Sequence, residues 1–513
     1  MTKFSYIILI GLLIFFTSCR KDFSTVASSG NLEFSKTTVY LDTVFSTIGS
    51  STYSLKVYNR SNDAIKIPTI QLAKGLNSKY RMIVDGMSGN NKIFENVELL
   101  AKDSLYIFIE TTANIVDANP TDFIYNDKIL FDNGAKQQSV DLVTMIQDCN
   151  FIFPNRSLDK TIYEKITVQG FDPDTRGHTL VTPQELHWTN VKPYVIYGNV
   201  LVPNGQTLII DPGTQVYFHD GSTLIVDTNA TLDIQGNLNV TDVSGKIITR
   251  NEVTFEGDRL EPEYEDVPGQ WGTVFLFSAN NNKVNYLKLK NAIIGLYLIP
   301  TISSTNFPKL EITNSQIYNC SFYGILAQQS VILGKNIVMN YAGQACFAGT
   351  IGGNYDFTHC TFNNNWNSTK QQAVYINNYV TDKNDVPIAS ANINASFKNS
   401  IIYGSNNVEF VLDKKEVAGF TTTWTTVFDK CLIKFNDPNN RLINIPEYNS
   451  FRNVAENYLN ENPIFINVNS NNLKVPNNSF VKNKGNAIYS TFSDILQQNR
   501  SASSDIGAYN VNP

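Results

Sequence analysis

The sequence predicts an all-β protein in two parts, an antiparallel β-sandwich followed by a parallel β-helix solenoid. Two observations predict this. Short strand-like runs separated by turn signals fill residues 31–148, a pattern typical of a sandwich. A short motif then recurs through residues 289–435 at nearly fixed spacing. Such a period is typical of a solenoid, in which each unit buries its apolar face only against its neighbours.

Composition and charge bound the functions that the chain can serve. The 513 residues carry a formal net charge of −6, and hydrophobic residues make up 42% of them. This length predicts more than one domain, and the hydrophobic content is enough for a packed core. No basic run follows the N-terminus, so neither a nucleic acid nor an anionic membrane surface is an expected partner.

The N-terminus has the features of a secretion signal over residues 1–18. Lys3 precedes an apolar run from Tyr6 to Phe16, which is too short to span a bilayer. The last residue of that run opens the sequence Phe-Thr-Ser-Cys, which resembles a bacterial lipobox with phenylalanine where leucine is usual. In such a motif the cysteine becomes the lipidated first residue. An ordinary signal peptide with a chance cysteine is the alternative.

We predict lipid attachment at Cys19 and a tether over residues 19–30. The lipid would anchor the chain to the outer membrane of a bacterial cell envelope, facing either the periplasm or the exterior. The sequence holds no other stretch of transmembrane length. The lipid would then be the only membrane contact.

Residues 31–148 are predicted to form an immunoglobulin-like β-sandwich. Its strand-like runs are 32–41, 53–58, 64–72, 80–84, 104–111 and 139–146. The domain lacks an internal cysteine pair and a tryptophan, so the disulfide-bonded immunoglobulin pattern is absent. The stretches DTVFSTIGSS (42–51), NRSNDAIKI (59–67) and DSLYIFIE (103–110) resemble a module that precedes β-helices in uncharacterised envelope lipoproteins. We expect a spacer that lifts the solenoid from the membrane.

The remaining chain divides into a junction at 149–197, a β-helix at 198–450 and a terminal coil and cap at 451–513. The periodic pattern is loose in the junction, and Thr-Leu strand motifs then recur between residues 207 and 232. We interpret these motifs as entrance coils. A cap is needed because the last coil of a solenoid otherwise exposes its strand edges.

Each repeat unit starts with a polar residue and continues with a fixed alternation. The starting residues, spaced 23, 22, 23, 40 and 31 apart, are Asn291, Asn314, Asn336, His359, Asn399 and Lys430. Side chains at positions +1 and +3 from each start are predicted to face the core, and those at +2 to face outward. Asparagine suits a bend because it tolerates left-handed backbone angles. A unit of this length fits three short strands and three turns.

This repeat resembles the right-handed parallel β-helix family, which includes pectate-lyase-like enzymes and many surface proteins without known activity. The run IIDPGTQVYF (209–218) resembles the entrance coils of that family. The final SDIGAYN (504–510) resembles its terminal coil, although Asn510 stands where an acid is usual. The resemblance implies a right-handed coil.

Enzymes on this fold need charged residues that the predicted outward column lacks. Lyases use outward carboxylates that hold calcium together with an arginine or lysine base, and hydrolases use paired carboxylates. The outward +2 column holds Ile293, Gln316, Val338, Thr361, Ile401 and Leu432. We therefore predict no catalytic residue, and the fold alone does not indicate an activity.

Cysteines, histidines and acids give no predicted metal site. Without Cys19 five cysteines remain, an odd number with no metal-ligand spacing, and we interpret Cys360 and Cys431 in the +1 column as buried thiols. The four histidines show no paired spacing. The acidic stretch at 256–266 offers calcium ligands as an alternative, but it lacks the rhythm of a calcium loop, so we expect a solvated loop. We predict neither a metal nor another cofactor.

The longest repeat unit carries aromatic and amide side chains suited to sugar binding. These are Trp366, Tyr375, Asn377 and Tyr379. Aromatic faces flanked by amides stack well on sugar rings. The alternative is an ordinary loop held by a buried tryptophan.

We therefore predict a lipid-anchored envelope protein that binds surface partners, glycans in particular, through loops of the β-helix and without catalysis. A polysaccharide lyase or glycoside hydrolase is the first alternative, and turnover would separate it from a binder. A structural scaffold for other envelope proteins is the second alternative, and it would retain no glycan.

Overall fold

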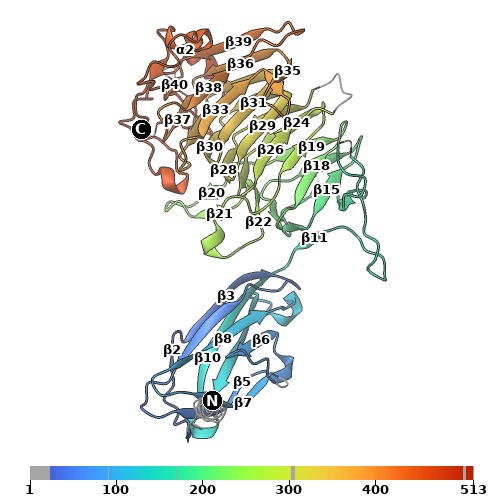
Figure 1. The fold of residues 1–513 in the computed structure, drawn as a ribbon, viewed down its shortest axis with the longest axis vertical. Helices are drawn as coiled ribbons and strands as arrows, with labels where there is room; N and C mark the ends of the chain where they lie inside the picture. The colour runs from blue at the N-terminus through green and yellow to red at the C-terminus, as the bar shows by residue number, and fades with distance from the viewer. Residues whose placement is uncertain (1–23, 90–91, 169, 302–306, 501–503, 512–513) are drawn as a thin grey trace, which may run out of the picture. The chain divides into compact units, whose positions relative to one another are not determined.

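The computed structural model describes residues 24–89, 92–168, 170–301, 307–500 and 504–511 (Figure 1). The predicted fold class is confirmed: the chain is nearly all β, with a β-sandwich followed by a parallel β-solenoid. The chain divides into two compact units between Asp148 and Cys149. The predicted signal and Cys19 lie outside the described residues. Within the described residues, no helix has the length and apolarity needed to cross a membrane.

The N-terminal unit is built from two sheets. One has the order β1-β5-β9-β10-β3, with β7 also paired to β5, and the other has the order β2-β4-β8-β6. The strands are β1 (Val26–Ala27), β2 (Glu33–Phe34), β3 (Thr38–Phe45), β4 (Tyr53–Tyr58), β5 (Ile65–Leu72), β6 (Tyr80–Val84), β7 (Ile93–Leu99), β8 (Ser104–Thr111), β9 (Ile124–Phe131) and β10 (Gln138–Gln147).

Strict alternation along the strands creates the sandwich core. In β8, Leu105, Ile107 and Ile109 are buried, whereas Tyr106 and Phe108 between them are exposed. Most pairs are antiparallel as predicted, but β3 runs parallel to β10, and β1 runs parallel to β5. Parallel pairing is available to these strands because long stretches of chain separate the partners, so no tight turn has to join them.

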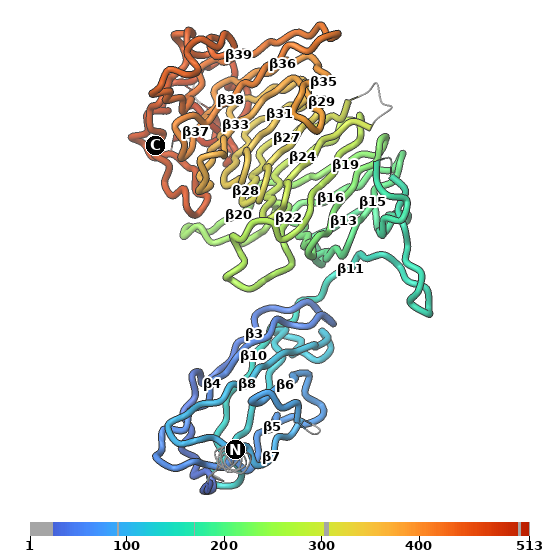
Figure 2. Tube along the Cα trace, viewed as in Figure 1, coloured from blue at the N-terminus to red at the C-terminus, as the bar shows by residue number. Residues whose placement is uncertain are grey.

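The solenoid has three walls, which we number in the order that the chain visits them (Figure 2). The first wall is an 11-stranded parallel sheet. Its strands are β11 (Asn150–Ile152), β14 (Tyr194–Ile196), β17 (Gln215–Phe218), β22 (Val253–Gly257), β25 (Leu287–Lys290), β28 (Gln316–Cys320), β30 (Val338–Ala342), β32 (Thr361–Asn364), β37 (Ile401–Gly404), β40 (Leu432–Ile433) and β41 (Tyr458–Leu459).

The second and third walls belong to one 16-stranded sheet. The second wall holds β12 (Gly177–Thr179), β15 (Asn199–Val202), β18 (Thr223–Val226), β23 (Val274–Leu276), β26 (Ile294–Leu298), the first halves of β29 (Tyr323–Lys335) and β31 (Ala345–Thr358), β33 (Gln372–Asn377) and β38 (Phe410–Asp413). The third wall holds β13 (His187–Trp188), β16 (Thr207–Ile210), β19 (Thr231–Gln235), β24 (Asn281–Asn285), β27 (Lys309–Thr313), the second halves of β29 and β31, β36 (Ile393–Lys398) and β39 (Trp424–Asp429).

Short elements complete the described chain. Two hairpins project from the coils, β20 (Val240–Thr241) with β21 (Ile247–Thr249) and β34 (Tyr379–Thr381) with β35 (Pro387–Ser390). The helical elements are single turns: α2 (Asn449–Arg452) and the 3-10 helices η1 (Gly75–Asn77), η2 (Ile115–Asp117), η3 (Gly134–Lys136), η4 (Pro262–Tyr264), η5 (Pro446–Tyr448), η6 (Val468–Ser470) and η7 (Ala487–Tyr489).

Left-handed residues make the corners of the coil. The predicted bends at Asn314, Asn336, His359, Asn399 and Lys430 are confirmed, with φ between 46° and 54°. The long strands β29 and β31 turn from the second wall into the third at Gln329 (φ 43°) and Ile351 (φ 59°). Such angles are uncommon for residues other than glycine. The coil geometry therefore imposes them even on glutamine and isoleucine.

The prediction that Asn291 begins the repeat series was wrong. Lys288 pairs with Gln316 and Lys290 with Tyr318, so Asn291 stands beside Asn319 at the corner after the first wall. The corner before that wall is occupied by Tyr286 (φ 48°) in this coil. Two different corners use left-handed asparagines, and spacing alone did not tell them apart.

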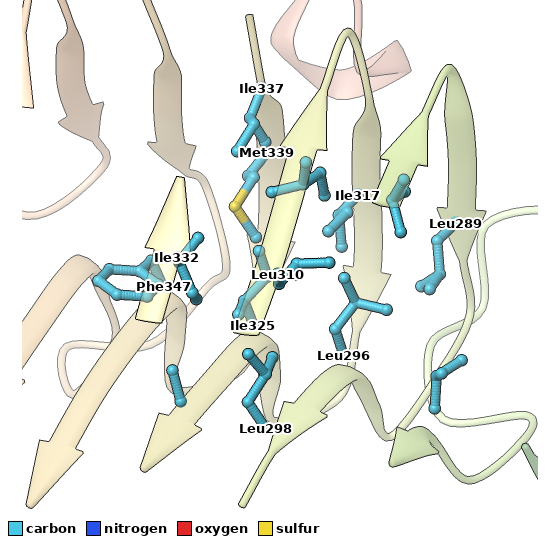
Figure 3. Packing of buried hydrophobic residues seen from close by; sticks show 14 of the residues in the cluster. Leu289, Leu296, Leu298, Leu310, Ile317, Ile325, Ile332, Ile337, Met339 and Phe347 are labelled. Atoms are coloured by element: carbon cyan, nitrogen blue, oxygen red, sulfur yellow. The ribbon is translucent and has the colours of Figure 1, made fainter. Parts of the chain in front are cut away.

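The predicted inward columns form the solenoid core. Side chains at +1 and +3, such as Ile337 and Met339 or Cys360 and Phe362, are fully buried. Figure 3 shows Ile337 and Met339 beside Ile317, Leu310 and Ile325 from neighbouring coils.

Stacking repeats the same side chain from coil to coil. Phe357, Phe397 and Phe428 occupy one column, with ring centroids 5.4 and 5.3 Å apart. Because parallel strands lie about 4.8 Å apart, like side chains in one column come directly into contact.

The predicted junction at 149–197 is in fact the first coil. Its strands β11, β12 and β13 pair in parallel with β14, β15 and β16. These strands have only two or three residues, and a long connection separates β11 from β12. A period-2 pattern needs more residues than that, so this coil could not be predicted from the sequence.

The end of the solenoid is closed by residues at the start of the predicted cap and just before it. Tyr448 and Phe451 enter the core, and both rings contact Phe435 at centroid distances of 5.0 and 5.2 Å. The segment that follows β41, of which residues 460–500 and 504–511 are described, does not sit on the end. It returns along the outer surface of the first wall, and we call it the C-terminal cover.

Contacts along its length fix the C-terminal cover on the first wall. The Asn340 side chain donates to the Val468 carbonyl at 2.9 Å, and the Asn336 side chain donates to the Ser493 carbonyl at 2.8 Å. The outward +2 side chains Val338, Ile401 and Leu432 are fully buried beneath it. The apolar residues Val338, Ile401 and Leu432 of the predicted outward column are therefore buried because the chain covers them.

Candidate functional site

Charged and neutral polar side chains stand on the third wall, at positions −1 and −3 before its bends. The set is Asp233, Gln235, Lys283, Asn285, Glu311, Thr313, Lys335, Asp356, Lys398 and Asp429. The prediction of no catalytic residue rested on the +2 column alone. The same alternation, continued backward through the bend, predicts that these side chains also face outward.

A polar groove runs where this wall meets the C-terminal cover. Two adjoining hollows of about 430 and 320 Å³ share Gln235, Asn285 and Thr313 as lining. Phe492 and Gln497 of the cover line one side. The groove thus joins segments that are far apart in the sequence.

Most charges near the groove hold the structure together. Lys398 contacts both carboxylate oxygens of Asp356 at 2.9 and 3.0 Å. The Tyr489 hydroxyl of the cover donates to Asp429 at 2.7 Å. The ammonium of Lys335 lies 5.2 Å from the centroid of the Phe492 ring. The first contact joins neighbouring coils of the wall and the other two tie the wall to the cover, so we assign the acids no catalytic role.

Three of the predicted sugar-binding residues come together on the second wall. Tyr375 and Asn377 lie on β33 and Tyr379 on β34. Both tyrosine hydroxyls donate to the same oxygen, Oδ2 of Asp413, at 3.1 and 2.6 Å. The Asn377 side chain donates to the Tyr375 hydroxyl at 3.2 Å. Asp413 was missed because its place beside Asn377 depends on strand register.

Neighbouring amides hold this cluster rigidly. The Asn378 side chain exchanges two hydrogen bonds with the backbone of Lys415, at 2.9 and 3.0 Å. Burial, followed by the hydrogen bond to Asp413, raises the pKa of Tyr379 to about 12, and burial likewise raises the pKa of Tyr375. Both phenols therefore stay protonated at neutral pH and act as donors.

The cluster continues as a row of half-exposed tyrosines. One outward column of the second wall reads Tyr297, Leu326, Ala348 and Tyr375, and Tyr323 stands in the next column beside Ala345. The leucine and the alanines are buried, and the tyrosines pack against them. We call Tyr297, Tyr323, Tyr375 and Tyr379 the tyrosine platform.

Trp366 lies apart from the platform. It is half-buried at the corner between β32 and β33, next to Gly343 of the preceding coil. The amides beside it serve the corner: Asn364 is fully buried and exchanges hydrogen bonds with Ala342 at 2.8 and 3.1 Å. Trp366 and the tyrosines lie in the same long repeat unit of the sequence, but the chain turns from the first wall to the second between them.

The acidic stretch at 256–266 is neutralised by basic partners. Lys290 lies 3.0 Å from Glu256 and 3.7 Å from Glu265, and His219 lies 2.8 Å from Asp258. These ion pairs occupy carboxylates that a calcium ion would need as ligands, so they disfavour the calcium alternative. In the described part of the chain, no group of three or more histidines, cysteines, aspartates or glutamates is placed to hold a metal.

Cysteines and the central histidine belong to the core. Cys320, Cys346, Cys360 and Cys431 are buried as free thiols. Burial raises the pKa of Cys320, Cys360 and Cys431 to about 12, so these thiols are unreactive. Burial lowers the pKa of His359 to about 2, and its Nε2 accepts a hydrogen bond from Asn399 at 3.0 Å.

Sequence comparisons place the chain in no known group. No protein-family model matches it. No curated protein matches it either.

Solved structures match parts of the chain only. The E. coli chaperone DraB is 16% identical over 24% of this chain, which spans 57% of the chaperone chain, with a TM-score of 0.16. A PapD-like domain of human CEP192 is 11% identical over 24% of this chain and 89% of that domain, with a TM-score of 0.16. A family 123 glycoside hydrolase from Clostridium perfringens is 9% identical over 31% of this chain and 30% of its own, also with a TM-score of 0.16.

Proposed function

We propose that this chain is a lipid-anchored envelope protein whose solenoid binds an extended glycan without changing it chemically. The tyrosine platform carries the proposal. Half-exposed aromatic rings aligned along one face of a rigid wall are suited to sugar rings, which pack their apolar faces on aromatic surfaces.

The polar groups of the platform supply hydrogen bonds beside the rings. Asp413 uses Oδ2 for the two phenols, and among the described residues none donates to its Oδ1. A ligand hydroxyl would satisfy this oxygen.

The length of the platform favours a polymer. Tyr297 and Tyr375 are three strand steps apart in register, which corresponds to about 14 Å at the usual spacing of parallel strands. A single sugar ring does not cover that distance, so one ligand that touches both tyrosines is a chain of sugar units.

The envelope location rests on the N-terminal sequence. The apolar run followed by Thr17, Ser18 and Cys19 resembles a lipoprotein signal and supports this proposal. The parallel coils agree with a right-handed β-helix of the pectate-lyase-like kind, as the repeat implies. Such a solenoid presents long, rigid walls to a polymer at the cell surface.

Binding to polysaccharides tests the proposal. The full chain in detergent is run through gels that contain neutral or uronic-acid polysaccharides, with and without calcium, and released sugars are followed in parallel. We expect retardation by at least one polysaccharide and no products. Products would establish the lyase or hydrolase alternative, and neither retardation nor products would favour the scaffold.

Variants locate the binding. Tyr375→Ala and Tyr379→Ala should each weaken retardation by about five- to tenfold, which corresponds to about 1 kcal/mol for one lost stacking contact. Tyr40→Ala is the matched control, because Tyr40 is 66% exposed on the sandwich. Equal retardation of all three variants would reject the platform as the binding site.

A further inference from the structure

The first coil forms the open N-terminal end of the solenoid, which we call the mouth. Polar residues stand there in columns that hold core side chains in later coils. Asn150 stands in the column of Tyr194 and Val216, and His178 stands in the column of Val200 and Leu224. Elsewhere these columns are apolar. The strands β11, β12 and β13 form this end of the solenoid (β11 is marked in Figure 1).

A cavity of about 820 Å³ occupies the mouth. Its lining includes the aromatic side chains of Phe151, Phe153 and Tyr194 together with His178, Glu185 and His187. This volume lies within the range of small-ligand sites, which combine apolar walls with a few polar groups.

His178 is held between two carboxylates at the wall of the cavity. Its Nδ1 lies 2.9 Å from Glu164, and its Nε2 lies 2.9 Å from Glu185. One imidazolium therefore faces two carboxylates, which leaves at least one net negative charge. Within the described residues, neither Arg156 nor Arg176 forms an ion pair with these carboxylates, and both guanidinium groups stack on Tyr163 at 4.6 and 4.0 Å.

The carboxylates are fixed in place. The backbone N–H groups of Val181 and Thr182 and the Thr182 hydroxyl all donate to Oε2 of Glu185, between 2.9 and 3.0 Å. Glu164 accepts from the Asn155 side chain at 2.8 Å and from the Thr179 N–H at 3.0 Å. The negative charge is thus part of the rigid wall and does not move away from a ligand.

Aromatic surface faces the same space. Phe153 is 52% exposed, and Tyr194 stacks on Trp188 with ring centroids 4.9 Å apart. The Tyr194 hydroxyl accepts from the Thr189 N–H at 3.1 Å, and this side chain is 7% exposed. His187 is held by Asp211 through Nε2 at 2.9 Å.

We propose that the mouth of the first coil binds a protonated amino sugar. The excess carboxylate attracts the ammonium group, and the aromatic walls stack on the sugar ring and add cation–π attraction. This site is separate from the tyrosine platform and does not depend on it.

Titration calorimetry on the full chain in detergent tests the proposal. The probes are the β-1,4-linked disaccharide of glucosamine and the same disaccharide with both amines acetylated. We expect the free amine to bind about tenfold more tightly than the acetylated form, and salt at about 0.5 M to weaken it severalfold. Equal affinity for both, or no binding of either, would overturn the proposal and leave a merely polar end coil.

Two variants and one further probe sharpen the test. Phe153→Ala should weaken binding of the free disaccharide about fivefold, whereas Phe420→Ala, at a residue 44% exposed elsewhere on the solenoid, should leave it unchanged. Equally tight binding of lysine amide would contradict an amino sugar, because the ring would then contribute nothing.

Discussion

The outer surfaces of the first and second walls differ in what lies over them. The first wall carries apolar outward residues such as Val338 and Ile401, and the C-terminal cover buries them completely. The second wall carries tyrosines over alanines and leaves the rings half-exposed. An apolar outward column therefore marks self-packing, whereas an aromatic column over small residues marks a surface available to a ligand.

The largest effect is expected beneath the C-terminal cover. Ile401→Asp would place an unpaired charge between the wall and the cover, and should lower the free energy of unfolding by about 4 kcal/mol or more. Leu333→Asp is the matched control, because Leu333 also points outward but is 37% exposed on the third wall. It should change stability by less than about 0.5 kcal/mol. Denaturant unfolding measures both, and similar losses would show that the cover does not seal the first wall.

A smaller effect is expected at the corner between the two walls. Glu409 is fully buried there, and its Oε2 and the Oε1 of Gln371 both lack partners among the described residues. Burial raises the pKa of Glu409 to about 8 from an ordinary value of 4.5. The folded state then binds one more proton than the unfolded state between these values. The contribution of Glu409 to stability is therefore fully present below pH 4.5 and is lost as the pH rises to about 8.

Unfolding measured across that pH window tests the assignment. Glu409→Gln should flatten the fall in stability, because the amide does not titrate. Glu416→Gln, at a side chain 77% exposed, should leave the fall unchanged. A Glu409→Gln profile that overlays the unsubstituted protein would mean that Glu409 is already ionised in the fold.

The smallest effect is expected at the far end of the platform. Tyr297→Ala should weaken binding of a long polysaccharide about fivefold, or about 1 kcal/mol, but should not affect a disaccharide that reaches Tyr375 alone. Inhibition of gel retardation by sugars of increasing length would show this. Equal losses for short and long ligands would mean that Tyr297 acts on the shape of the wall and not through contact.

Sequence patterns predicted the elements that depend on residues close together in the chain. The bends at Asn336 and His359 and the inward columns followed from alternation and from the tolerance of asparagine for left-handed angles. The first coil was missed because its strands are too short to show a period. Asn291 was misplaced because asparagine serves two corners.

Contacts between residues far apart in the chain could not be predicted from the sequence. The C-terminal cover depends on pairs such as Gln497 with Asn237, which hydrogen-bond at 2.7 Å across 260 residues. Tyr375, Asn377 and Tyr379 lay close enough in sequence to be grouped, but Asp413 joins them only through strand register. Trp366 was grouped with them because sequence distance does not show the corner between two walls.

Hydroxyl-radical labelling of tyrosines, with and without a polysaccharide that retards the chain, tests the central comparison most directly. Tyr375 and Tyr379 should label in the free protein and be protected by the polysaccharide. Tyr318 and Tyr509, buried between the first wall and its cover, should stay unlabelled in both samples. Unchanged labelling of Tyr375 and Tyr379, or labelling of Tyr318, would contradict an open second wall beside a sealed first one.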